Sequence, residues 1–175
     1  TIGNDIDLLD CTIGGTNDLT LSGGIDLQNG TRTINVTNTA ATQITGVISS
    51  GGLTKTGNGS LELSGTNTFT GPLNINGGAV TLSGGAALDD NVDVTVANGA
   101  TLDIDNDETI DGLTANVGSM VNLDANLTVG DANGNSVVDA VVTGTGGITQ
   151  NGAAMLTISQ DNTYTGDTTV AAGNL

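Results

Sequence analysis

The chain has 175 residues, which suits one domain or one stretch of a longer repeat protein. Its 19 Asp and Glu residues face only 2 Lys and Arg and no His, so the formal net charge at pH 7 is −17. A chain this acidic repels nucleic acid and anionic membranes, so we expect no nucleic-acid partner and no direct insertion into a membrane.

The hydrophobic residues form 36% of the chain and alternate with polar residues in short runs that end at Gly, Asn or Asp. This pattern predicts β-strands and tight turns in a folded, all-β chain. In chain order the runs lie at residues 8–9, 13, 19–21, 25–27, 34–36, 44, 47–48, 53, 61–63, 73–75, 80–82, 92–96, 102–104, 110–113, 117, 121–123, 127–129, 137–138 and 141–142.

A three-sided coil of short strands takes roughly 20–25 residues for each complete turn, which we call a rung, so the spacing predicts about eight rungs. No shift in composition marks a linker, and we predict a single continuous β-solenoid over residues 1–175. Its core must be aliphatic, because Phe69 and Tyr164 are the only aromatic residues.

One phrase of the sequence occurs twice. Residues 51–80 and 146–175 align without a gap at an offset of 95 residues (146 − 51). Both copies contain Gly-Gly-x-Thr, then Leu-x-x-Ser, then Asn-Thr-aromatic-Thr-Gly. Repeats built of short strands and tight turns are typical of solenoids.

These residues resemble a known family. Residues 51–82, GGLTKTGNGSLELSGTNTFTGPLNINGGAVTL, are similar to the passenger-associated repeat of bacterial autotransporters. Residues 146–175 resemble it more loosely, and residues 19–53 resemble the run that commonly precedes it. The resemblance implies a right-handed parallel β-helix at the outer-membrane surface of a bacterium or outside the cell. The passengers of this family include adhesins, enzymes and inert stalks, so the fold does not choose among them.

The two ends of the chain fit together. Joining Leu175 to Thr1 gives Gly-Asn-Leu-Thr-Ile-Gly, in register with Gly-Ala-Val-Thr-Leu-Ser of the first copy. The chain is then either one period of a tandem array or a subunit that stacks on a second copy, Thr1 side to Leu175 side. No capping helix or Pro-bearing end strand is evident, and bare end rungs invite pairing. We also expect an excised piece, whose membrane anchor lies elsewhere, because it shows neither signal peptide nor initiating Met.

Paired carboxylates could hydrolyse glycosidic bonds, and Asp93, Asp103 and Asp105 are the candidates on the predicted outer face. Saccharide sites also use aromatic platforms, and lyases need a strong base or Arg. The chain has no Trp, no His, one Arg and one Lys, so we predict that it is not an enzyme.

Calcium is the better chemical hypothesis, and no other cofactor is indicated. Oxygen ligands alternate in two segments, at Asp103, Asp105 and Asp107 and at Asp131, Asn133, Asn135 and Asp139. Neither segment completes the EF-hand pattern of Gly at the sixth position and Glu at the twelfth. The alternative is that these residues form turns and keep the surface soluble.

Four further residues carry local predictions. Cys11 should be an unpaired, buried apolar residue. Lys55 should lie at the surface beside a carboxylate, where a pair contributes little. Asn67 and Asn162 should bond within their own turns, with the following aromatic ring packed at the rung edge.

Three functions follow in order of preference. The first is a non-catalytic structural β-helix that stacks end to end into a fibre, sheath or stalk. The alternative is an adhesin passenger whose host or matrix ligand the sequence does not identify, and the third is a carbohydrate-active β-helix. An adhesin should carry a long loop or an apolar patch, and the sequence indicates neither.

Overall fold

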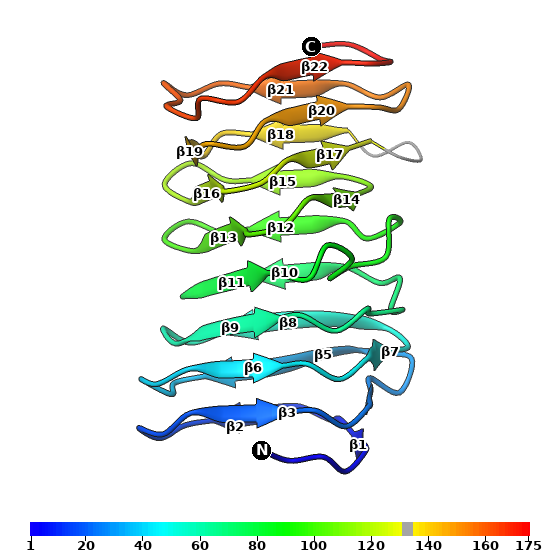
Figure 1. Ribbon diagram of the computed structural model, residues 1–175, viewed down its shortest axis with the longest axis vertical. Helices are drawn as coiled ribbons and strands as arrows, with labels where there is room; N and C mark the ends of the chain where they lie inside the picture. Colours follow the sequence, from blue (N-terminus) through cyan, green and yellow to red (C-terminus); the bar gives the residue numbers. More distant parts are fainter. Residues whose placement is uncertain (131–134) are drawn as a thin grey trace.

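The computed structural model describes residues 1–130 and 135–175, and this part of the chain consists of strands and turns without a helix (Figure 1). The strands are β1 (Ile6–Asp7), β2 (Cys11–Ile13), β3 (Leu19–Leu21), β4 (Ile25–Asp26), β5 (Thr31–Val36), β6 (Thr42–Ile44), β7 (Ile48–Ser49), β8 (Gly52–Thr56), β9 (Ser60–Leu63), β10 (Leu73–Ile75), β11 (Ala79–Leu82), β12 (Val94–Val96), β13 (Thr101–Ile104), β14 (Glu108–Ile110), β15 (Leu113–Ala115), β16 (Met120–Leu123), β17 (Leu127–Val129), β18 (Ser136–Val138), β19 (Val141–Gly144), β20 (Ile148–Gln150), β21 (Leu156–Ile158) and β22 (Thr168–Val170).

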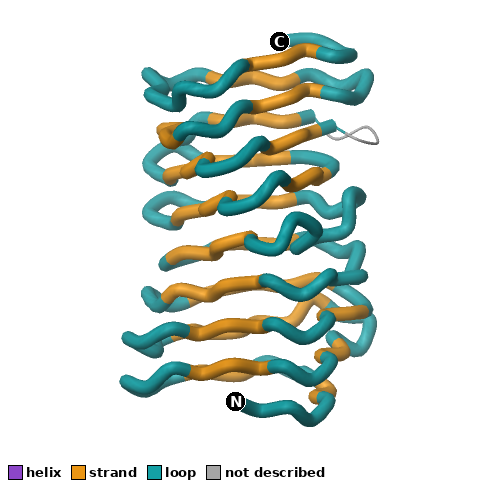
Figure 2. The backbone as a smooth tube through the Cα atoms, viewed as in Figure 1, coloured by secondary structure: helices purple, strands orange, loops and turns teal. Residues whose placement is uncertain are grey.

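The strands pair in parallel on three sides of a coil, and Figure 2 shows the successive turns of this coil stacked one above another. One side is an eight-stranded sheet, β2-β5-β8-β10-β12-β15-β18-β21, and a second is a seven-stranded sheet, β3-β6-β9-β11-β13-β16-β19. The third side holds β1-β4-β7 at the N-terminal end and β14-β17-β20-β22 at the C-terminal end. Each rung contributes one strand to the eight-stranded sheet, so the predicted parallel β-solenoid of about eight rungs is confirmed.

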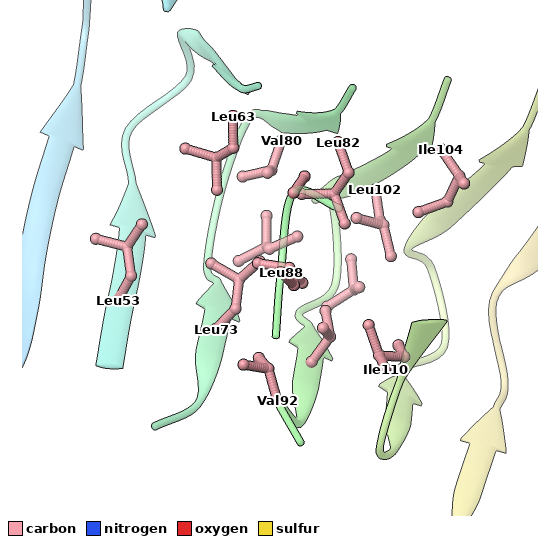
Figure 3. Packing of buried hydrophobic residues seen from close by; sticks show 14 of the residues in the cluster. Leu53, Leu63, Leu73, Val80, Leu82, Leu88, Val92, Leu102, Ile104 and Ile110 are labelled. Carbon is pink, nitrogen blue, oxygen red and sulfur yellow. The ribbon is translucent and has the colours of Figure 1, made fainter. Parts of the chain in front are cut away.

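The core is a set of aliphatic columns that run along the coil (Figure 3). Val80, for example, pairs in register with Leu61 on one side and Leu102 on the other. All three are fully buried, and burying one such side chain contributes about 1.5–3 kcal/mol. Phe69 is also fully buried, whereas Tyr164 only packs against the edge of the core.

Side-chain bonds replace strand pairing where the third side carries no strand, between β7 and β14. Asn67 accepts a bond from the Ile48 N–H at 2.6 Å and donates one to the Ala87 carbonyl at 2.6 Å. The Ala87 N–H then donates to the carboxylate of Glu108 at 2.8 Å. The prediction for Asn67 is therefore wrong: this buried side chain ties together the rungs before and after it, because the missing strand leaves their backbone groups unpaired.

The two copies of the repeat lie on different sides of the coil. In the first copy β8 and β10 belong to the eight-stranded sheet and β9 to the seven-stranded sheet. The equivalent strands of the second copy are β20 and β22 on the third side and β21 in the eight-stranded sheet. The spacing of 95 residues (146 − 51) is therefore not a whole number of rungs, and the second copy is turned by one side.

Lys55 is buried inside the coil, and the prediction of a surface position is wrong. Its Nζ donates to the carbonyls of Gly57 and Gly77 at 2.7 Å each, and to that of Thr56 at 3.3 Å. Burial lowers the pKa of Lys55 to about 8. The corner between β8 and β9 thus uses a buried cation to satisfy backbone carbonyls that have no strand partner.

Gln150 takes the equivalent position in the second copy and is also fully buried. Its Nε2 donates to the carbonyls of Gly152 at 3.2 Å and Ala154 at 3.4 Å. Its Oε1 is the one buried side-chain N or O without a partner among the described residues. The neutral amide of Gln150 therefore donates hydrogen bonds to the carbonyls of its corner, as the ammonium group of Lys55 does in the first copy.

Candidate functional surfaces

The structure separates the three carboxylates proposed as catalytic. Asp103 lies on β13, on the outer face of the seven-stranded sheet, and Asp105 follows two residues later. Asp93 comes before β12 of the eight-stranded sheet, where burial and the nearby charge of Asp111 raise the pKa of its carboxyl group. Only Asp103 and Asp105 are therefore neighbours, and Asp93 belongs to another part of the surface.

Asp103 is the most perturbed member of an acidic group on this face. Burial raises its pKa, and the charges of Asp105 and Asp124 raise it further. Hydrogen bonds from its in-register neighbours Thr81 and Asn122 act in the opposite direction, because they stabilise the ionised form. The outcome is a half-buried carboxylate crowded by two others.

Asp107 and Asp139, two of the proposed calcium ligands, bond to neighbouring rungs. The Oδ1 of Asp107 accepts from the backbone N–H of Asn126 at 2.9 Å and from its Nδ2 at 3.1 Å. The Oδ1 of Asp139 accepts from the hydroxyl of Ser159 at 2.5 Å. These bonds join neighbouring rungs, which neither the calcium prediction nor the turn interpretation specifies.

The second proposed calcium segment is described only in part. Asp131 and Asn133 lie outside the described residues, and the Oδ1 of Asn135 accepts from the backbone N–H of Met155 at 2.9 Å. Within residues 1–130 and 135–175, no group of three His, Cys, Asp or Glu side chains could hold a metal ion. Calcium binding stays a prediction.

An apolar groove lies beside the acidic group, and the sequence analysis missed it. Met120 and Val141 are in-register neighbours on the outer face of β16 and β19, and they are 45% and 40% exposed. With Gly99, Gly118 and other residues of the same corner they line a hollow of about 380 Å³. Val117, next to Gly118, is 62% exposed. The expectation of no apolar patch is therefore wrong.

A difference in corner length accounts for this groove. Residues 97–100 and 116–119 join the eight-stranded to the seven-stranded sheet in two successive rungs, but residues 139–140 suffice in the next rung. Because the corner at residues 139–140 is shorter than its two predecessors, it does not cover the side chain of Met120. The signal in the sequence is two adjacent apolar residues, Met120-Val121 and Val141-Val142, since one of each pair must face outward.

The chain offers no cation to this surface. Its one Lys is buried among carbonyls, and the Nε of its one Arg, Arg32, donates to the carbonyl of Leu27 at 2.9 Å. Arg32 and Lys55 lie on β5 and β8, whereas the groove lies over β13, β16 and β19. The acidic group and the groove therefore face solvent without a positive neighbour.

A free thiol and a second apolar hollow lie elsewhere on the surface. Cys11 is a free thiol that packs against the edge of the core, and burial together with the charge of Asp10 raises its pKa. Near the C-terminal end, Leu156, Ile158, Tyr164 and Leu175 help to line a hollow of about 350 Å³. The Tyr164 hydroxyl is hydrogen-bonded to that of Thr168.

Stacked short strands, tight corners and a polar outer face define a repeat protein of the β-solenoid class. Residues 1–130 and 135–175 contain no helix that is long and apolar enough to cross a membrane. The class alone says nothing about function, which depends on the surface that each rung displays.

Comparison with known proteins narrows the class. Residues 53–85 and 148–175 match the passenger-associated-transport-repeat family. A relative described as "Adhesin BmaC autotransporter", from Brucella suis biovar 1 (strain 1330), is 35% identical over 156 residues. The chain therefore carries two copies of the passenger-associated repeat of bacterial autotransporters, which confirms the resemblance of residues 51–82.

The match with this relative covers 86% of the chain but 4% of the relative, so the chain spans a small fraction of that protein's length. No solved structure matches the chain.

Proposed function

We propose that this chain is part of the passenger of an autotransporter adhesin, displayed on the bacterial surface, and that it works without catalysis. The observation that carries the proposal is the 35% identity to an autotransporter adhesin over 86% of the chain. The absence of catalysis is supported by the outer face, where Asp93 lies on a different side of the coil from Asp103, so these two carboxylates do not form a catalytic pair. Binding a partner in the groove requires no catalytic side chain. The chain then serves both as a length of stalk and as a binding surface.

Surface display tests this proposal. The chain is placed between a signal peptide and the β-barrel of an autotransporter in a Gram-negative host, and the cells are scored for protease accessibility and for adherence to cultured cells. We expect accessible chain and more adherence than with the barrel alone. A β-solenoid of similar length from an enzyme serves as the matched control. Accessible chain with no added adherence would leave only a stalk and contradict the adhesive part.

A second candidate is end-to-end stacking into a fibre, sheath or stalk, with the chain as its own partner from the Thr1 side to the Leu175 side. The apolar hollow at the C-terminal end favours it, because Leu175 is 68% exposed and Ile2, at the other end, is 45% exposed. A further rung, from a continued chain or a second copy, would cover these residues.

Electron microscopy of the purified chain, with and without calcium, tests the stacking. We expect filaments that Leu175→Asp abolishes. The control variant Val47→Asp changes an exposed residue in the corner between β6 and β7, away from the end rungs, and should leave the filaments intact. Filaments that need calcium would make the acidic segments bridging ligands. Monomeric rods under both conditions would refute the stacking.

A further inference from the structure

We infer that the groove over β13, β16 and β19, together with the acidic group beside it, docks a cationic amphipathic segment of another protein. Apolar side chains of the segment would enter the groove, and its Lys or Arg side chains would contact Asp103, Asp105 and Asp124. The inference rests on the proposed function, since it names the chemistry of the partner that an adhesive passenger would hold.

The groove supplies the apolar half of the interaction. Met120 and Val141 stand side by side at 45% and 40% exposure, and the glycines at the same corner keep the neighbouring wall low. Thr101 and Ala79 precede Met120 in the same outward column, so the large apolar side chains are confined to one end of it. An exposed apolar patch with a polar rim marks a contact site.

The acidic group supplies the charged half. The column next to Met120 on the same face contains Asp103 and Asn122, and Asp124 follows at the end of the strand. Burial raises the pKa of Asp103, and the nearby charges of Asp105 and Asp124 raise it further. The side chains of the one Lys and the one Arg are bonded to backbone carbonyls in other rungs, so a Lys or Arg side chain of a partner would complement this acidic group without competition from the chain's own cations.

Other partners fit less well. Nucleic acid and anionic membranes are repelled by a net charge of −17. A saccharide would want an aromatic platform, but Phe69 is buried and Tyr164 lies in the last rungs. The strands β13 and β16 pair on both edges, and the outer edge of β19 is bonded to residues 162–165 of the chain. A partner is therefore recognised through side chains rather than by adding a strand.

The test uses the full chain and a fluorescein-labelled peptide of Lys-Val-Ser repeats, with binding followed by fluorescence anisotropy. We expect saturable binding that weakens as salt is added, because the charged contacts are exposed. Two control peptides, of Glu-Val-Ser repeats and of Lys-Ser-Ser repeats, should bind at least about tenfold more weakly. Equal binding of the Lys-Ser-Ser peptide would overturn the inference, since it would show simple charge attraction to the whole chain.

Matched variants locate the site. Met120→Thr with Val141→Thr should weaken binding about tenfold, whereas Met155→Thr with Val170→Thr, of 49% and 41% exposure, should not. Thr already occupies outward positions of the seven-stranded sheet, as Thr101 does beside Met120, so the first pair of variants should fold. Thermal unfolding checks the folding of both pairs. Equal loss from both pairs would overturn the inference.

The acidic side is tested in the same way, with Asp103→Asn and Asp124→Asn against Asp161→Asn and Asp167→Asn near the C-terminal end. The first pair should weaken binding several-fold more than the second, and an equal effect would count against the site. Adherence of displayed cells without peptide binding would refute this inference alone. Peptide binding without adherence would refute the proposed function and leave the docking site standing.

Discussion

Replacing Lys55 by Gln should remove a pH dependence of stability that the buried ammonium group creates. The Nζ lies 2.7 Å from the carbonyls of Gly57 and Gly77, and the side chain is fully buried. Burial lowers its pKa from 10.5 to about 8. The second copy of the repeat already has Gln at the equivalent position, so Lys55→Gln should fold.

The sign and size follow from proton binding. Above about pH 8 the unfolded chain holds the Lys55 proton more tightly than the folded chain, so the free energy of unfolding rises with pH until about pH 10.5. One proton and a folded pKa of about 8 give a gain of about 1 kcal/mol between pH 8 and pH 9. Lys55→Gln should show no such gain.

Urea unfolding at pH 7, 8 and 9 is the assay, in a Cys11→Ser background. The substitution matters because the raised pKa of Cys11 makes the folded chain lose stability as pH climbs past the ordinary thiol value, which opposes the effect of Lys55. Lys55→Met is the matched control: it leaves the carbonyls of Gly57 and Gly77 without a donor. It should be about 1–3 kcal/mol less stable than Lys55→Gln at every pH. A rise between pH 8 and pH 9 that persists in Lys55→Gln would refute the reasoning.

Three further predictions concern the stability of the coil, and urea unfolding measures each of them. Leu102→Ala should cost about 2–5 kcal/mol, because the side chain is fully buried between two rungs and leaves a cavity; a cost below 1 kcal/mol would mean that the column collapses to fill it. Gly57→Ala should destabilise far more than Gly99→Ala: both have positive φ, but a Cβ at Gly57 would lie 2.3 Å from a backbone oxygen, and one at Gly99 meets nothing within 4 Å. Equal losses would show that strain in φ alone decides. Asn67→Ala should cost about 2–4 kcal/mol, more than Asn162→Ala, because Asn67 is buried and bonds the rungs on both of its sides, whereas Asn162 bonds one neighbouring rung, at Val142, and its own turn, at Gln160. Similar costs would show that the second bond between rungs adds nothing to stability.

Alternation of apolar and polar residues predicted most of the fold, because successive residues of a strand point alternately into the coil and out of it. Val94 and Val96 face inward as the pattern requires. The same alternation places Lys55 inward, in phase with Leu53, and the prediction failed because residue type was weighed above phase. Residue type alone does not show that the adjacent corner has unpaired backbone carbonyls, to which the buried ammonium group of Lys55 donates hydrogen bonds.

The surface was harder to predict than the core. The apolar groove depends on the lengths of three corners in successive rungs, and a single sequence does not say where each corner begins. The alternation put Asp103 and Asp105 on one outer strand face, but β13 ends at Ile104, so Asp105 starts the next corner. The rotation of the second repeat copy arises in the same way, from the summed lengths of the corners between the copies.

The rotation of the second repeat copy determines the direction in which each copy displays its outward residues. A repeat that recurs on the next side of the coil, rather than on the same side, distributes its outward residues around the axis, and a third copy at equal spacing would occupy the remaining side. Equivalent outward residues of the two copies can therefore be reached from two different sides of the coil.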